Sequence, residues 1–171
     1  MNADDVLDAM QDLTLRDGTP PSIAAVATAL GRTKQAVLHY FPDRGALEAA
    51  LAARAISRVD EAMTAAAGRG AAAATYLRLS LPTTEDRAVA LLVLASLRTH
   101  ASLPVEIGAA TERWEALIAQ ELDDPVRAEV VRLVGDGLFV EALVADPPSV
   151  ERVETLVAHL AGPGHGTESH P

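Results

Sequence analysis

Residues 22–44 read SIAAVATALGRTKQAVLHYFPDR, and this stretch decides how the first part of the chain folds. Ser22 is a good N-cap for a short helix that runs to about Leu30, where Gly31 ends it. Thr33 can cap a second short helix directly afterwards. The pattern therefore predicts two short helices joined at a glycine, which is the arrangement of a helix-turn-helix motif.

Small and apolar side chains stand where these two helices must pack on each other. Val26 and Ala27 precede Gly31, and Val37 follows it. Two helices that cross steeply at close range leave no room for a side chain much larger than that of Ala27. The glycine adopts the left-handed turn conformation at no steric cost. The packing requirement and the turn requirement thus favour the same motif.

Helices are also predicted along the rest of the chain. The sequence contains 34 alanines and only 3% aromatic residues, and alanine has the highest helix propensity. Proline, glycine and aspartate separate the predicted segments. We expect an all-α fold of about nine helices, over residues 4–16, 22–30, 33–40, 44–67, 71–81, 85–100, 104–122, 126–145 and 150–160, followed by a disordered tail at 162–171.

The composition excludes several classes of site. The 171 residues include no cysteine, which rules out disulfides, thiolate zinc sites, iron–sulfur clusters and a cysteine nucleophile. No P-loop, nucleophile elbow or HExxH motif occurs, and residues 68–73 fit GxGxxA only superficially because no strand precedes them. We therefore expect no catalytic residue, no metal site and no cofactor.

The hydropathy of the chain and its first five residues indicate where in the cell the protein is located. No apolar run reaches the roughly 18 residues that a membrane span needs. The chain starts MNADD, which is acidic where a secretory signal would be basic. We expect a cytoplasmic protein without membrane contact.

The charge distribution is uneven. The chain carries a formal net charge of −10, yet residues 18–58 are net positive and include Lys34, the only lysine. The field near a ligand is set by the nearest charged segment, so an acidic protein can still bind a polyanion through such a segment.

From Ser22 to Leu47 the sequence resembles the N-terminal domain of the tetracycline-repressor (TetR) family of bacterial transcriptional regulators. The resemblance rests on the glycine turn, the Thr33-capped helix and the run HYFPDRGAL at 39–47. It implies an N-terminal three-helix helix-turn-helix domain at 1–48 and a C-terminal helical domain at 49–161 that binds an effector and dimerises. The implied function is that of a ligand-responsive repressor that binds a palindromic DNA operator as a dimer.

The resemblance also implies which side chains contact DNA. Thr33, Lys34 and Gln35 begin the second helix of the motif, the end that meets base edges. Gln35 can pair with adenine, and Lys34 can reach guanine acceptors or a phosphate. Further contacts, mainly to phosphate, are implied for Ser22, Arg32, His39, Tyr40 and Arg44. Ser22 can instead serve only as a cap, and Tyr40 can pack half-buried.

The C-terminal part predicts an effector site and a dimer interface. A modest, apolar effector pocket could be lined by Met63, Tyr76, Leu94, Arg98, Trp114 and Phe139, although a tryptophan such as Trp114 is more often a core residue than a pocket residue. Helix 126–145 is apolar around much of its circumference, and with helix 150–160 it could form half of an intersubunit four-helix bundle, as in the family. The alternative is that both helices are buried within one chain.

A second function remains open at this stage. The family usually has a tyrosine at the position of Leu38, and its loss removes a common phosphate contact. Together with the acidic balance of the chain, this leaves room for a non-catalytic helical interaction protein whose helix-turn-helix no longer binds DNA.

Overall fold

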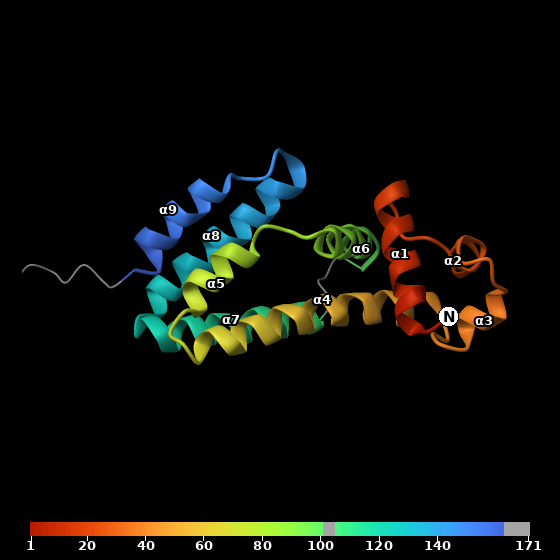
Figure 1. The fold of residues 1–171 in the computed structure, drawn as a ribbon, viewed down its shortest axis with the longest axis horizontal. Helices are drawn as coiled ribbons and strands as arrows, with labels where there is room; N and C mark the ends of the chain where they lie inside the picture. Colours follow the sequence, from red (N-terminus) through yellow and green to blue (C-terminus); the bar gives the residue numbers. More distant parts are fainter. Residues whose placement is uncertain (101–104, 163–171) are drawn as a thin grey trace, which may run out of the picture. The chain divides into compact units, whose positions relative to one another are not determined.

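A computed structural model describes residues 1–100 and 105–162, with residues 96–100 and 105 described by their backbone alone, and the chain is all-α (Figure 1). Within these residues there are nine helices and no strand. Each expected helix is present, and its ends shift by at most two residues. The helices are α1 (Ala3–Asp17), α2 (Ile23–Ala29), α3 (Lys34–Leu38), α4 (Arg44–Ala67), α5 (Ala72–Leu79), α6 (Thr84–His100), α7 (Val105–Leu122), α8 (Pro125–Val144) and α9 (Val150–Leu160). The expected tail lies, from residue 163 on, outside the described residues.

Side-chain caps start the first helices where the sequence predicts them. The Ser22 hydroxyl accepts a hydrogen bond from the Ala25 amide at 3.1 Å, and the Thr33 hydroxyl accepts one from the Ala36 amide at 3.2 Å. Asp43 caps α4 in the same way. These bonds satisfy amide groups that have no partner within the first turn of a helix.

The chain forms two compact units, and along the sequence a segment of the second unit interrupts the first. The first unit comprises residues 1–61 and 82–111, and the second comprises residues 62–81 and the chain from 112. This division differs from the expected boundary at residue 48, because α6 packs on α1 and so joins the unit that contains the helix-turn-helix. Where the functional boundary lies stays a prediction.

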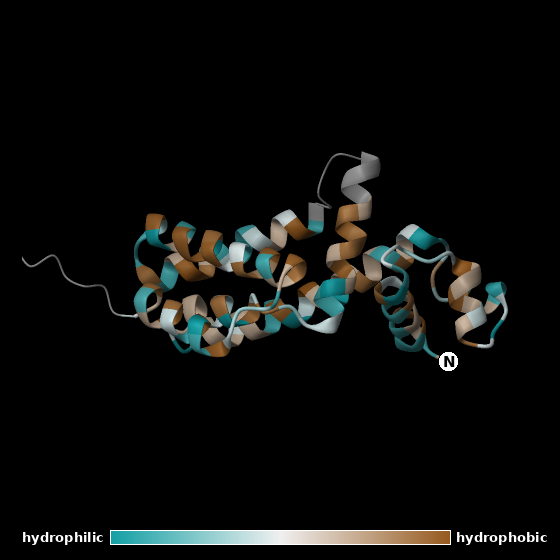
Figure 2. Ribbon diagram, turned by 90° about the horizontal axis from the view of Figure 1, so that it is seen from above, coloured by the Kyte–Doolittle hydropathy of each residue, from teal (hydrophilic) through white to brown (hydrophobic). Residues whose placement is uncertain are grey.

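One hydrophobic core holds the first unit together. Met10 of α1, Val26 of α2 and Val37 of α3 are fully buried in it, and Ala88 and Leu92 of α6 belong to the same cluster. The described part of α6 is hydrophobic after its polar first turn at residues 84–87 (Figure 2). Helix α6 is therefore part of the support of the helix-turn-helix.

Small side chains let the helices of the second unit approach closely. Helix α5 contacts both α8 and α9. Fully buried alanines of this unit are Ala66, Ala72, Ala73, Ala128 and Ala142. Because such side chains fill little space, the helices pack with narrow gaps.

Two polar contacts in the second unit satisfy helix ends. Helix α5 has no capping side chain of its own, and the Glu121 carboxylate of α7 accepts a hydrogen bond from the Ala72 amide instead. Arg127 of α8 donates a hydrogen bond to the Leu160 carbonyl at the end of α9, at 2.9 Å. Both contacts join segments far apart in sequence.

In the part of the chain that the structure describes, no helix is long and apolar enough to cross a bilayer.

Candidate nucleic-acid interface

The turn between α2 and α3 has the geometry that the sequence predicts. Gly31 adopts a φ of +61°, in the left-handed region that favours glycine. Next to it, the Arg32 amide donates a hydrogen bond to the Ala27 carbonyl at 2.9 Å, which folds α3 back on α2. Ala27 is buried at this crossing. The two helices therefore form a helix-turn-helix whose second helix presents one side to solvent.

Three polar side chains at and just before the start of α3 are exposed and make no hydrogen bond or ion pair of their own within the described residues. Arg32, Lys34 and Gln35 are all exposed. Within the described residues none of them makes a side-chain hydrogen bond or an ion pair. Side chains in this condition can contact phosphates or base edges without breaking an intramolecular bond.

The other predicted contact residues already have partners. Ser22 and Thr33 serve as helix caps. The Tyr40 hydroxyl donates a hydrogen bond to the Met1 carbonyl at 2.6 Å, and the Arg44 guanidinium bonds the Glu48 carboxylate at 2.5 Å. His39 is exposed and lies edge-on against the Tyr40 ring.

A groove lined by charged residues of both signs adjoins this surface, and the sequence analysis did not predict it. A cavity of about 550 Å³ is lined by Asp5, Asp8, Asp12 and Arg16 of α1 and by Ala29, Leu30 and Arg32 at and just after the end of α2. The hydrogen bond from the Asn2 backbone, followed by the positive charge of the chain's N-terminus and then that of Arg32, holds the pKa of Asp5 below its usual value. The spacing of Asp5, Asp8 and Asp12 already places them on one side of a helix, but only the fold brings that side of α1 beside the turn between α2 and α3.

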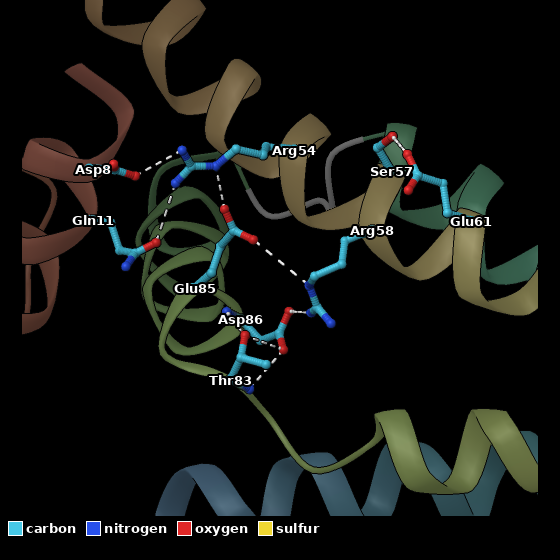
Figure 3. A network of polar contacts seen from close by, with 9 residues as sticks. All are labelled: Asp8, Gln11, Arg54, Ser57, Arg58, Glu61, Thr83, Glu85 and Asp86. Atoms are coloured by element: carbon cyan, nitrogen blue, oxygen red, sulfur yellow. Dashed lines mark hydrogen bonds and ion pairs between the residues drawn. The ribbon is translucent and has the colours of Figure 1, made fainter. Parts of the chain in front are cut away.

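Arg54 of α4 joins three helices through its guanidinium (Figure 3). Its Nε donates to Glu85 of α6 at 2.5 Å, its Nη1 to Asp8 of α1 at 2.9 Å and its Nη2 to Gln11 of α1 at 3.4 Å. Burial lowers the pKa of Arg54, but the bonds to Glu85 and Asp8 outweigh it, so the pKa lies above its usual value.

Arg58 extends the same network one turn further along α4. It binds Asp86 at 2.5 Å and approaches Glu85 at 3.9 Å (Figure 3). Asp86 in turn accepts a hydrogen bond from the Thr83 amide at 2.8 Å, at the start of α6. The network therefore attaches the first turn of α6 to α4 and, through Arg54, to α1.

The comparisons with known proteins address the other end of the chain. The family model described as tetracyclin repressor-like, C-terminal domain matches residues 70–162. The chain belongs to the tetracycline repressor-like family. The matched segment begins after the helix-turn-helix, so it supports the resemblance seen at residues 22–47 independently. No curated protein and no solved structure matches the chain.

In this TetR-like chain the residues expected at an effector pocket belong to both units, and the pocket stays a prediction. Met63 is fully buried, Tyr76 is buried, and Trp114 and Phe139 are half-buried, all in the second unit. Leu94 is exposed and belongs to the first unit. Arg98 also belongs to the first unit, and its side chain lies outside the described part of α6.

Tyr76 is the centre of a polar cluster in the second unit. Its ring lies 6.3 Å from that of Trp114, and its hydroxyl donates to Asp136 at 2.7 Å. Arg132 binds Asp136 at 2.8 Å and Glu115 at 2.5 Å. Burial, followed by the negative charge of Asp136, raises the pKa of Tyr76 far above its usual value. Sequence reasoning named Tyr76 and Trp114 but missed the charged partners, which come from distant segments.

No group of three or more acidic or histidine side chains arranged to hold a metal ion occurs among the residues that were described.

Proposed function

We propose that this TetR-family protein is a cytoplasmic, ligand-responsive transcriptional repressor that binds a palindromic DNA operator as a homodimer. The observation that carries the proposal is the exposure of Arg32, Lys34 and Gln35 at and just before the start of α3. In helix-turn-helix proteins this end of the second helix enters the major groove. Regulators of the family are generally not enzymes, in line with the lack of a catalytic motif.

The side chains of α3 fit two kinds of contact. Gln35 can bind adenine through two hydrogen bonds, and Lys34 can bind guanine acceptors or a phosphate. Arg44 can turn from Glu48 to a phosphate, because a single exposed ion pair contributes only about 0–1 kcal/mol. The Tyr40 hydroxyl can likewise leave the Met1 carbonyl and donate its hydrogen bond to a phosphate.

The effector response acts through α6. Helix α6 belongs to the family-matched segment and contributes Ala88 and Leu92 to the core beneath the helix-turn-helix. A small apolar molecule that displaces α6 would strain the bonds from Arg54 to Asp8 and Glu85 and so change the position of α1. Coupling between two such sites is typically worth about 1–3 kcal/mol.

The test is a salt titration of binding to genomic promoter fragments. Affinity should fall steeply as salt rises, and Arg44→Ala should weaken all sequences about equally while reducing the salt slope by roughly one. Glu61→Ala is a control that changes an exposed charge of α4 away from the motif. An affinity independent of salt would contradict the proposal.

The second candidate is a helical interaction protein whose helix-turn-helix does not bind DNA. The bonds made by Tyr40 and Arg44 favour it, since both potential phosphate contacts are occupied within the chain. Under this alternative no genomic fragment is retained at low salt, whereas the repressor should retain a defined set.

A further inference from the structure

Lys34 is the only lysine of the chain, and every other residue in its count of 14 lysines and arginines is an arginine. A guanidinium stays protonated at any pH that proteins tolerate, so it offers no electron pair to an electrophile. The ε-amine of a lysine does offer one in its unprotonated form, which is why lysine is the residue that acyl groups modify. Chemistry directed at lysine side chains can therefore act on this chain at one position, and that position is the first residue of α3.

The side chain of Lys34 has no partner to give up before it reacts. It is exposed, and among the described residues no carboxylate or carbonyl group bonds it. The N-cap of α3 is the Thr33 hydroxyl, which accepts the hydrogen bond from the Ala36 amide, so the Lys34 side chain takes no part in starting the helix. The amino group of Met1, by contrast, lies 3.5 Å from the Asp5 carboxylate.

A second cation stands close to Lys34. Arg32 is exposed and lies two residues earlier, so the two Cα atoms are at most about 7.6 Å apart. Its side chain likewise makes no hydrogen bond or ion pair with a described residue. Two cations within the screening length of about 10 Å at 0.1 M salt attract a dianion more strongly than one. Small reagents that carry a phosphate should therefore gather at this end of α3.

We propose that Lys34 is an acylation site, at which an acyl phosphate transfers its acyl group to the side-chain Nζ. The unprotonated amine attacks the carbonyl carbon of the donor, and an N–C bond forms. The bond from that carbon to the phosphate oxygen breaks, inorganic phosphate leaves with the electron pair, and the surplus proton of the nitrogen passes to water. No atom is oxidised or reduced. A neutral amide then stands where α3 carried a cation.

The donor class follows from the surroundings of the amine. An acyl phosphate is small, so an open helix end admits it without an enclosing pocket. It is also doubly charged, so Arg32 can attract its phosphate while the acyl carbon meets Lys34. Because both side chains are exposed, neither has to leave a packed position for the reaction.

Acylation would neutralise a side chain that the proposed function assigns to DNA, and this consequence rests on that function. Each contact between a basic side chain and a phosphate contributes about 0.9 to the slope of log K against log salt. The loss of one contact should therefore weaken DNA binding roughly eightfold at 0.1 M salt and flatten the salt dependence by about one. The fold should not change, because the Lys34 side chain bonds no described residue.

The probe for the site is acetyl phosphate, added to the full chain without DNA at mildly alkaline pH. Peptide mass spectrometry follows the occupancy of Lys34 with time. Its initial rate should at least equal that of Nα-acetyl-lysine amide under the same conditions. Arg32→Ala should slow the reaction roughly twofold to fivefold. The matched control is Arg69→Ala, which removes an exposed arginine between α4 and α5, in the second unit, and should leave the rate unchanged.

Three results would overturn the site. One is a reaction at Lys34 that is slower than the reaction of the model amine. The others are an unchanged rate in Arg32→Ala and an equal slowing in Arg32→Ala and Arg69→Ala.

DNA binding after the reaction gives a second, independent measurement. Treated wild type should bind a retained promoter fragment roughly eightfold more weakly than the untreated protein at 0.1 M salt. Lys34→Arg has no acceptor at this position, so the ratio of its treated to untreated affinity should stay near one, whatever its starting affinity. Acetylation of the Met1 amino group is common to both chains and cancels in this comparison. An equal loss in both chains would overturn the role of Lys34.

The two measurements also separate this inference from the proposed function. A chain that is acylated at Lys34 as expected, but retains no DNA with or without treatment, would contradict the function and leave the site standing. A chain that retains DNA equally well with Lys34 fully acylated would contradict the consequence of acylation and leave DNA binding standing. Far-ultraviolet circular dichroism of treated and untreated protein should agree, and a loss of helix on treatment would contradict the claim that the fold does not depend on this side chain.

Discussion

At the scale of single residues, the recognition helix depends on very few side chains. Helix α3 spans only Lys34–Leu38, and Val37 on it is buried. Lys34 and Gln35 are therefore the long polar side chains that α3 itself exposes. Under the proposed function, specificity for bases would concentrate on these two side chains, with Arg32 and His39 on either side.

Gln35→Ala should relax the preference at one base pair of each operator half-site. The bidentate contact that the amide can make to adenine is worth roughly 1–3 kcal/mol of discrimination. Binding measured against every single-base variant of a retained operator checks this. If all variants keep the ranking found with the wild type, Gln35 does not contact a base.

Gly135→Ala should destabilise the protein, by about 1–3 kcal/mol in the free energy of unfolding. A Cβ at Gly135 would lie 2.5 Å from the Tyr76 ring and 2.7 Å from the Ser80 hydroxyl, and the buried ring has little room to move. The matched control is Gly108→Ala in α7, where a Cβ meets nothing within 4 Å. That variant should be neutral or gain up to about 1 kcal/mol, as alanine favours helix. Urea unfolding compares the two.

Tyr76 makes stability sensitive to alkaline pH. Its pKa in the folded protein lies above the unfolded value near 10. The folded state thus keeps the proton after the unfolded chain has lost it, and the contribution of Tyr76 is complete below pH 10. Above that pH the free energy of unfolding should fall, by at most about 1.4 kcal/mol per pH unit. Tyr76→Phe should flatten this decline, and an unchanged slope would contradict it.

At the scale of helices, the first unit is held by polar as well as apolar contacts. Helices α1, α4 and α6 share the core, and the guanidinium of Arg54 connects all three. Its side chain is 28% exposed, so these bonds are partly shielded from water. A contact of this kind orients helices more than an exposed ion pair can.

Arg54→Ala should lower the free energy of unfolding by about 1–3 kcal/mol, since it removes the hydrogen-bond donor of the partly buried Glu85 and leaves it the weaker contact with Arg58 at 3.9 Å. The control is Arg16→Ala, which removes a pair to the adjacent Asp17 that is 68% and 44% exposed. That change should cost less than about 1 kcal/mol. Thermal unfolding followed by circular dichroism compares them, and equal losses would show that the network contributes nothing special.

At the scale of the whole molecule, the segment recognised by the family model takes part in both units. Residues 82–111 lie inside the matched range 70–162 and yet pack in the unit that contains the helix-turn-helix. A change in α6 should therefore alter the packing of α2 and α3, which belong to the same unit.

Leu92→Ala should loosen the helix-turn-helix although it lies about sixty residues after the Gly31 turn in sequence. Leu92 is 7% exposed within the core that includes Val26 and Val37, and large-to-small changes of this kind cost about 2–5 kcal/mol. Leu94→Ala is the matched control, because Leu94 is 55% exposed. Hydrogen exchange of α2 and α3 should rise in the first variant only. A similar rise in both would argue against this coupling.

The helices and the glycine turn were predictable from the sequence because they depend on neighbouring residues. Ser22, Thr33 and Asp43 cap helices through amides three residues away, and Gly31 meets a local demand on φ. The exposure of Lys34 and Gln35 followed from the same short motif. The pairing of Tyr76 with Asp136 and of Arg54 with Glu85 could not be predicted, because these residues are 60 and 31 positions apart. Only tertiary packing decided that α6 joins the first unit and that α8 keeps an uncovered apolar face. The apolar side chains of these helices look alike in sequence, and only the fold determines which of them another helix covers.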